Sequence, residues 1–406
     1  MIRISSQQVF SSGISRLQEL NASLNKTQQQ IATGKKVNQP SDDPVAAARI
    51  LKLDQEVTRI ETYQRNASLA QNRLQQEESA LASAVDLVQR IRELTVQAGN
   101  GSLSANDRSS IAEELKQRLD QLADIANTQD ASGEYIFSGF QGDQPAFVKQ
   151  PDGTWRYNGD EGQRVLEIDD GVTVAISDHG KGIFVDVPAA VSVKSATVTT
   201  GHISDLTLDN SQALRNAFGG AVPDDLTVVV AADGSVTVEN RNVVPADVLT
   251  TDPSPLQVGE EFEVAGLRMT VSEDTTAGEF TIGISDKQSV FGTIETLIAG
   301  LESLDKTTPD GQAAYDALIA ESLINLDNAQ ESLILKQTEL GGRLNAVEST
   351  QAFLEDSGLY TKEIRSELED LDYAEAISNL SFQSFVLEAA QQSFAQVAQL
   401  SLFDRL

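Results

Sequence analysis

Two long heptad patterns constrain the fold of this chain more than any other feature. Near the carboxyl end, apolar residues recur every seven positions, at Leu326, Leu333, Leu340, Val347 and Leu354. In the first hundred residues the apolar positions advance mostly by three and four, at Ile50, Leu53, Val57, Ile60, Leu74, Leu81, Val85 and Val88, with Gln64, Ala67, Gln71 and Glu78 between them. Such spacing is typical of a coiled-coil seam. Because more than 200 residues separate the two seams, they are natural partners in an antiparallel pair.

A short polar joint precedes the first seam. Gly34 can supply the left-handed geometry that ends a helix, and Pro40 blocks its continuation. Asp43 can cap a new helix whose first residue is Pro44, where the missing amide hydrogen costs nothing. We therefore predict a terminal helix, a joint over residues 34–43, and a helix over 44–98 that is about 80 Å long at 1.5 Å per residue.

Both ends of the chain carry apolar stripes. The first stripe consists of Ile14, Leu17, Leu24 and Ile31, and the last contains Leu380, Leu387, Phe394, Val397, Leu400, Leu402 and Phe403. Residues 1–36 carry five Lys or Arg against one Glu, and residues 366–406 carry seven Asp or Glu against one Arg, which favours their pairing. We expect both ends, roughly residues 1–40 and 365–406, to be weakly ordered in the free protein.

The middle of the chain has the pattern of antiparallel β structure. Gly, Pro and Asp separate β-prone runs, which include RVLEI, VTVAI, GIFVDV, LTVVV, SVTVE, EFEVAGLRMTV and EFTIGI. Asp233-Gly234 predicts a hairpin, and residues 210–218 predict a lone helix. Helical pattern returns at SDKQSVFGTIETLIAGLESL, where Ser285 and Gln288 have capping-box spacing.

Composition excludes several classes of function. The formal net charge of -31 and pI near 4.3 argue against binding to nucleic acid or to an anionic membrane. There is no cysteine, and His179 and His202 are the only histidines, so we expect no metal site. No nucleophile elbow, phosphate loop or dinucleotide fingerprint is present, so we expect neither a cofactor nor an enzymatic activity.

Four motifs in order along the chain resemble the bacterial flagellin superfamily. They are IATGKKVNQPSDDPVAAA (31–48), QRIRELTVQAGNGSLSANDRSSIAEELKQRLDQL (89–122), LGGRLNAVES (340–349) and ISNLSFQSFVLEAAQQSFAQVAQLSLFDRL (377–406). Within that superfamily, MIRISSQQVF, GEYIFSGF, YNGDEGQRVLEIDDGVTVAISDHGKGIF and the ending LSLFDRL resemble the branch that joins hook to filament. The resemblance covers most of both helical ends.

The resemblance implies a structural subunit of the bacterial flagellum. Such a subunit is secreted by the flagellar type III export apparatus with an export chaperone. It assembles as a ring of its own copies at the distal end of the hook, between hook-associated protein 1 and flagellin. Two alternatives remain open at this stage, a filament-forming flagellin and a surface adhesin carried on a coiled-coil stalk.

The matching motifs also suggest which residues lie at subunit contacts. The candidates are Asn38, Ser41, Asp42, Asp43, Arg49, Arg90, Leu94, Asn379, Leu380, Leu400, Leu402 and Phe403. At the local level, the simpler explanations of the first two motifs are an ordinary capped linker and a solvated helix face that packs against other subunits, and the linker is compatible with the implied role.

The predicted fold class is α+β, with a long antiparallel coiled-coil rod from both termini and an inserted antiparallel β domain. We expect five segments, which are a terminal helix and joint (1–43), a helical arm with a β-hairpin (44–140), a β-rich outer domain (141–285), a returning helical arm (286–364) and a terminal helix (365–406).

Overall fold

The computed structural model describes residues 2–218, 223–243, 247–249, 256–284 and 287–403. The chain divides into two compact units. The first contains residues 1–68, 168–172 and 348–406, and the second contains residues 69–167 and 173–347. Within the described part of the chain, no helix combines the length and the apolar content that a membrane crossing requires.

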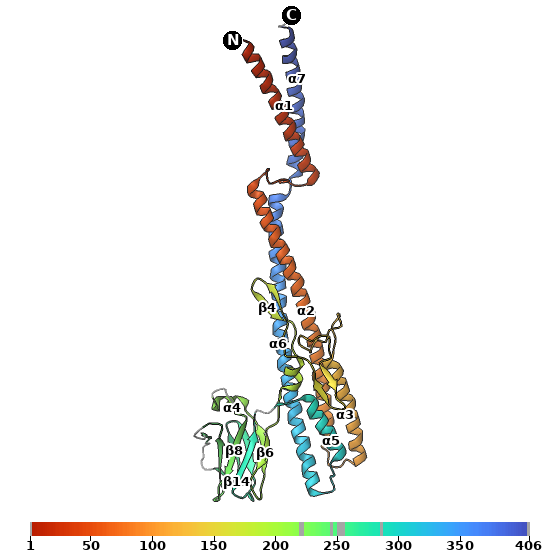
Figure 1. Cartoon of the computed structure of the whole chain (residues 1–406), viewed down its shortest axis with the longest axis vertical. Coiled ribbons are helices and arrows are strands. Elements are labelled where there is room, and N and C mark those ends of the chain that lie inside the picture. Colours follow the sequence, from red (N-terminus) through yellow and green to blue (C-terminus); the bar gives the residue numbers. More distant parts are fainter. Residues whose placement is uncertain (1, 219–222, 244–246, 250–255, 285–286, 404–406) are drawn as a thin grey trace. The chain divides into compact units, whose positions relative to one another are not determined.

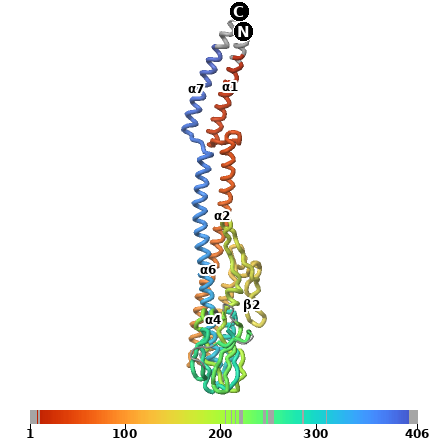
Figure 2. The backbone as a smooth tube through the Cα atoms, turned by 90° about the vertical axis from the view of Figure 1, so that its left-hand side faces the viewer, coloured from red at the N-terminus to blue at the C-terminus, as the bar shows by residue number. Residues whose placement is uncertain are grey.

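The first unit brings the two ends of the chain together. Helix α1 (Ile2–Thr33) packs against helix α7 (Tyr373–Phe403), as both Figure 1 and Figure 2 show. The start of α2 (Pro44–Ala98) runs antiparallel to the end of α6 (Pro309–Glu369). Arg365 lies 3.0 Å from Asp54, and Lys362 lies 3.0 Å from Glu61. The pairing of the two seams is therefore antiparallel, as predicted.

The second unit adds two shorter helices to the remaining parts of α2 and α6. Helix α3 (Ala105–Ala126) begins with a capping box between Ser104 and Asp107, and α5 (Val290–Ser303) packs against it. The buried Tyr315 hydroxyl of α6 donates to the carbonyl of Ala98 at the end of α2, over 2.7 Å. This bond ties the start of α6 to the end of α2.

The seam of α6 is confirmed and that of α2 is partly wrong. Leu326, Leu333, Leu340, Val347 and Leu354 are all buried. In α2, the predicted seam positions Glu78 and Val85 are only half-buried, and Glu77 and Ala84 are buried in their place. After Ala67 the next buried residue is Ala70 and not the predicted Gln71, so every second seam position lies one residue earlier than predicted, while Leu74, Leu81 and Val88 are buried as predicted. Such a local change of period leaves the apolar pattern nearly unaltered.

An aromatic cluster forms the core beside these helices. Phe137, Phe147, Phe184 and Phe291 are buried, and the rings of Phe147 and Phe291 stack with centroids 4.5 Å apart. Phe184 lies on a short π-helix, η1 (Lys181–Val185), whose end is closed by the amide of Asp186 donating to the carbonyl of Lys181. The prediction of β structure for GIFVDV was therefore mostly wrong, because burial of Phe184 in the cluster outweighs the local preference of these residues for a strand.

Among the described residues of the β region, three sheets have two strands each. They pair β1 (Phe147–Lys149) with β2 (Trp155–Tyr157), β3 (Val165–Asp169) with β4 (Val172–Ala175), and β5 (Val187–Pro188) with β15 (Lys287–Gln288). The hairpin expected before residue 140 is only an isolated bridge between Gln129 and Tyr135.

Two larger antiparallel sheets share one apolar core. One sheet has the order β10 (Asp247–Leu249), β9 (Ser235–Asn240), β8 (Asp225–Val230), β14 (Gly278–Gly283) and β6 (Ser192–Ala196), and β11 (Leu256–Gln257) also pairs with β9. The other has the order β12 (Glu261–Val264), β13 (Leu267–Val271) and β7 (Ile203–Leu208).

Alternating burial along these strands supplies the shared core. In β8 and β9 every second residue is buried, and Val228 and Val238 are paired with each other. Phe262, Met269 and Ile282 join them, with Leu214 from the short helix α4 (Ser211–Ala217). The predicted hairpin at Asp233-Gly234 and the lone helix are confirmed. So is the fold class, with long helices from both ends and antiparallel sheets between them.

Two expected boundaries differ from the structure. Helix α5 begins at Val290 after Ser289, because Lys287 and Gln288 are paired with β5 as strand β15. Ser285, the proposed cap, lies outside the described residues. Helix α6 continues to Glu369, so a division after residue 364 falls inside it.

We predict that Phe291→Ala lowers the free energy of unfolding by about 3–5 kcal/mol, because it removes a fully buried ring from the aromatic cluster. Chemical denaturation followed by circular dichroism measures this loss. Leu335→Ala, at an exposed position of α6, is the control and should change stability by less than about 0.5 kcal/mol. Equal effects of the two substitutions would contradict the assignment of the core.

Candidate assembly surfaces

The joint between α1 and α2 is held by local polar contacts. Gly34 has φ 72°, and its amide donates to the carbonyl of Gln30, so it ends α1 as predicted. Asp42 Oδ2 accepts from the amides of Asn38 and Gln39, at 3.1 and 3.0 Å. Lys26 of α1 lies 3.0 Å from the same carboxyl group, and this hydrogen bond and the Gln39 amide lower the pKa of Asp42. The joint therefore has a defined shape.

The start of α2 follows the predicted capping. Asp43 Oδ1 accepts from the amides of Val45 and Ala46, at 3.0 and 2.9 Å, and Pro44 is the first helical residue. These two bonds satisfy amides that have no partner inside the helix. Ser41 and Arg49 are exposed on either side of this cap.

A second joint, between α6 and α7, pairs with the first. The amide of Lys36 donates to the carbonyl of Glu369 over 2.7 Å, and the amide of Leu371 donates to the carbonyl of Gly34 over 3.0 Å. The Lys35 ammonium group forms an ion pair with Glu369. The helix breaks at the two ends of the chain are thus joined by backbone hydrogen bonds.

Two residues of the second joint were missed by the sequence reasoning. Asp372 Oδ1 accepts from the amides of Ala374 and Glu375 and caps α7. The φ of 72° at Gly34 favours glycine, and a Cβ atom there would lie 2.9 Å from the Tyr373 hydroxyl, so the side chain of Tyr373 would have to shift. The spacing of Asp372 and Glu375 is a capping pattern that the sequence contains.

Helices α1 and α7 meet through polar hydrogen bonds and through apolar side chains that are only half-buried. Thr27 Oγ1 donates to Gln383 Oε1, and Gln383 Nε2 donates to Ser23 Oγ, both over 3.1 Å. Among the side chains that the structure describes, none of the apolar residues of α1 is buried, and Ala376 is the only buried one of α7. The contact between these helices therefore leaves the described apolar side chains, other than Ala376, at most half-buried.

Beyond Tyr373 at its start, helix α7 presents two further exposed aromatic residues among those described. Phe382 and Phe385 are 67% and 69% exposed, and lie three residues apart on one side of the helix. Leu380 and Gln383, which are half-buried, mark the side that meets α1. An exposed apolar face of this kind, next to a face that is already covered, is typical of a helix that binds a further partner.

The structure separates the other predicted contact residues into three groups. Arg90 is exposed and forms ion pairs with Glu93 and Glu114, and Asn379 is exposed on α7. Leu94 is 1% exposed, so its side chain packs inside the chain and is not available to a neighbouring subunit; its assignment as a contact is corrected. The positions Leu400, Leu402 and Phe403 lie on α7, but their side chains are outside the described ones.

Comparisons with known proteins agree with this architecture. The family model of the bacterial flagellin N-terminal helical region matches residues 4–142. The family model of the bacterial flagellin C-terminal helical region matches residues 323–406. Flagellar hook-associated protein 3 of Salmonella typhimurium (strain LT2) is 25% identical over 402 residues, which is 99% of each chain.

Solved structures give the same result. The crystal structure of Xanthomonas campestris FlgL is 30% identical, with a TM-score of 0.60 over 77% of this chain and 99% of that one. The flagellar hook-associated protein 3 of Legionella pneumophila is 29% identical, with a TM-score of 0.62 over 79% of this chain and 98% of that one. The chain therefore belongs to the bacterial flagellin superfamily, in its flagellar hook-associated protein 3 family.

Proposed function

We propose that this chain is a structural subunit of the bacterial flagellum that forms the junction between the hook and the flagellin filament. The observation that carries the proposal is the exposed aromatic face of α7, next to an α1–α7 contact that buries almost no apolar side chain among those described. Such helices gain stability by packing against other subunits. A solved relative from Legionella pneumophila is described as a flagellar junction protein, which supports the same role here.

The junction role implies a set of partners. In this proposal the chain forms a ring of its own copies at the distal end of the hook, with hook-associated protein 1 on one side and flagellin on the other. The export chaperone and the flagellar type III export apparatus deliver it, and the acidic, apolar α7 is the segment where we expect the chaperone to bind. The role is architectural, and no catalytic step is part of it.

The remaining predicted residues would then lie at contacts between subunits. We place Asn38, Ser41, Asp42, Asp43 and Arg49 at one contact through the joint, and Arg90 at another. Asn379, Leu380, Leu400, Leu402 and Phe403 belong to α7. The small apolar burial between α1 and α7 also supports weak order of both ends in the free protein. Protection of these ends from proteolysis in the free protein would contradict that expectation.

We predict that the double variant Phe382→Ser and Phe385→Ser abolishes filament attachment, because it removes the exposed aromatic face without touching the core. The variant is expressed in cells that lack the native copy, and attached filaments are counted by electron microscopy. Phe140→Ser, which removes another exposed phenylalanine away from α7, should leave attachment unchanged. Normal filaments on the double variant would remove the observation on which the proposal rests.

We predict that Asp43→Ala raises amide exchange at Val45 and Ala46 about fivefold, because loss of a helix cap costs about 1 kcal/mol. Hydrogen exchange on the purified protein measures this effect, with Ser41→Ala as the control. If the joint is also a subunit contact, replacing both Asp43 and Pro44 by alanine should reduce filament attachment in cells. Full attachment with both residues replaced would rule out the contact and leave Asp43 a helix cap only.

A further inference from the structure

Helix α2 carries a carboxyl group at a buried position of its seam. Glu77 is 2% exposed and lies between the buried residues Leu74 and Leu81. Its Oε1 atom has no hydrogen-bond partner among the described residues. Burying an ionised carboxylate without a partner is costly, so a group in this position favours its neutral form.

The space beside Glu77 is too small to hydrate a charge. Glu77 lines a cavity of about 20 Å³, together with Arg73, Glu134, Arg164 and Ser177 among others. One buried water needs at least about 10–15 Å³ on this scale, so the cavity has room for a single water molecule. A carboxylate there would lose most of the hydration that stabilises it in bulk water.

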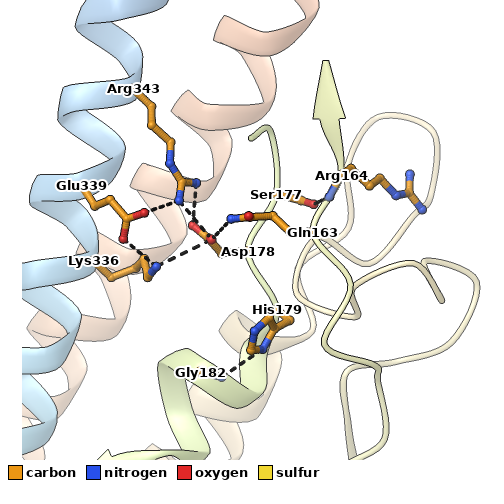
Figure 3. A network of polar contacts seen from close by, with 9 residues as sticks. All are labelled: Gln163, Arg164, Ser177, Asp178, His179, Gly182, Lys336, Glu339 and Arg343. Atoms are coloured by element: carbon orange, nitrogen blue, oxygen red, sulfur yellow. Dashed lines mark hydrogen bonds and ion pairs between the residues drawn. The ribbon is translucent and has the colours of Figure 1, made fainter. Parts of the chain in front are cut away.

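The cations of α6 near Glu77 already have acidic partners. Figure 3 shows Arg343 and Lys336 directed at Asp178, at 2.9 and 3.6 Å, while both also form ion pairs with Glu339. Asp178 is itself buried, and a second negative charge beside it is unfavourable. Burial first, and then the charge of Asp178, raise the pKa of Glu77 well above its usual value.

The cations that line the cavity are also occupied. Arg73 lies 3.1 Å from Asp130 and 3.2 Å from Glu134, and Arg164 lies 2.6 Å from Glu134. Glu77 is therefore faced by titratable or charged groups from every neighbouring element, which are Arg73, Asp130, Glu134, Tyr135, Arg164, Asp178, Lys336 and Arg343. Each of the arginines and the lysine in this set forms an ion pair with a carboxylate other than Glu77.

We propose that Glu77 is an internal proton-binding site beside residues 176–180, and that loss of its proton favours release of this segment from α2. The charge of Asp178 on this segment opposes ionisation of Glu77, as burial does, whereas the hydrogen bond from the Asp178 backbone to the Glu77 carboxyl group favours the ionised form and is the smaller effect. Neighbouring bonds hold the same segment, from the amide of Ile176 to the carbonyl of Arg164 and from the amide of Gly180 to the carbonyl of Phe137, at 2.8 and 2.7 Å. The segment is followed in the chain by η1, by β5 and then by the strands of the larger sheets. In this proposal the proton on Glu77 therefore controls how firmly the chain is attached to α2 just before these elements.

The direction of the pH dependence follows from the neutral form. In the closed state Glu77 holds its proton, and in the open state it ionises with the ordinary glutamate pKa of 4.5. The proton's contribution to closure is complete below the pKa of the open state. It falls progressively as the pH rises from there toward the raised pKa of the closed state. This inference does not depend on the proposed junction role.

Hydrogen exchange of residues 176–180 across a pH series tests the proposal on the full chain. After correction for the intrinsic exchange rate, opening of the wild-type segment should rise about tenfold per pH unit in that window, because one proton is released on opening. Glu77→Gln keeps the shape of the neutral acid and should remove this dependence. Glu78→Gln, at the adjacent half-buried position, should behave as the wild type.

A second measurement detects the proton directly. At neutral pH the infrared spectrum of the wild type and of Glu78→Gln should contain the carbonyl band of a protonated carboxyl group, which Glu77→Gln should lose. Equal pH dependence of exchange in the wild type and Glu77→Gln would overturn the proposal. Absence of the infrared difference would overturn it as well, whatever the exchange data show.

Discussion

Antiparallel pairing of α2 with α6 is the constraint on which the other features depend. Asp54 meets Arg365 in the first unit, and Ala98 meets Tyr315 in the second, so within each unit the part of α6 runs antiparallel to the part of α2. The chain therefore brings residues 34–43 and 369–372 to the same place, where their backbones form hydrogen bonds. It also leaves α1 and α7 side by side, although their contact buries few apolar side chains among those described.

Much of this could be read from the sequence because its signals are local or periodic. The heptad leucines of α6, the Gly34 and Asp43 caps and the Asp233-Gly234 turn each act within a few residues, and each was predicted correctly. The errors arose where tertiary contacts prevail. Phe184 turns a β-prone run into a π-helix because its ring enters the aromatic core. Glu77 takes the buried seam position that was predicted for Glu78, because one step of the seam is three residues instead of four. Gln71 and Glu78 are polar, so the sequence does not indicate which residue of this stretch enters the seam.

The candidate site was predicted only in part, for a related reason. The first joint is built from neighbouring residues. The second contains Asp372, which caps α7, and Tyr373, which lies beside Gly34 across more than 300 residues of sequence. Leu94 was assigned to a contact by its motif alone, and burial assigns it to the core. Phe382 and Phe385 belong to a helix with apolar residues on several sides. The sequence does not indicate which of these residues are exposed, because that depends on where α1 packs against the helix.

The central claim is that this chain joins the hook to the filament. Electron microscopy of cells that lack the gene, with flagellin assayed in the medium, tests that claim most directly. The account predicts hooks without filaments and flagellin released into the medium, both restored by the wild-type gene. Intact filaments on cells that lack the gene would contradict it, and the chain would then have an accessory role in the flagellum.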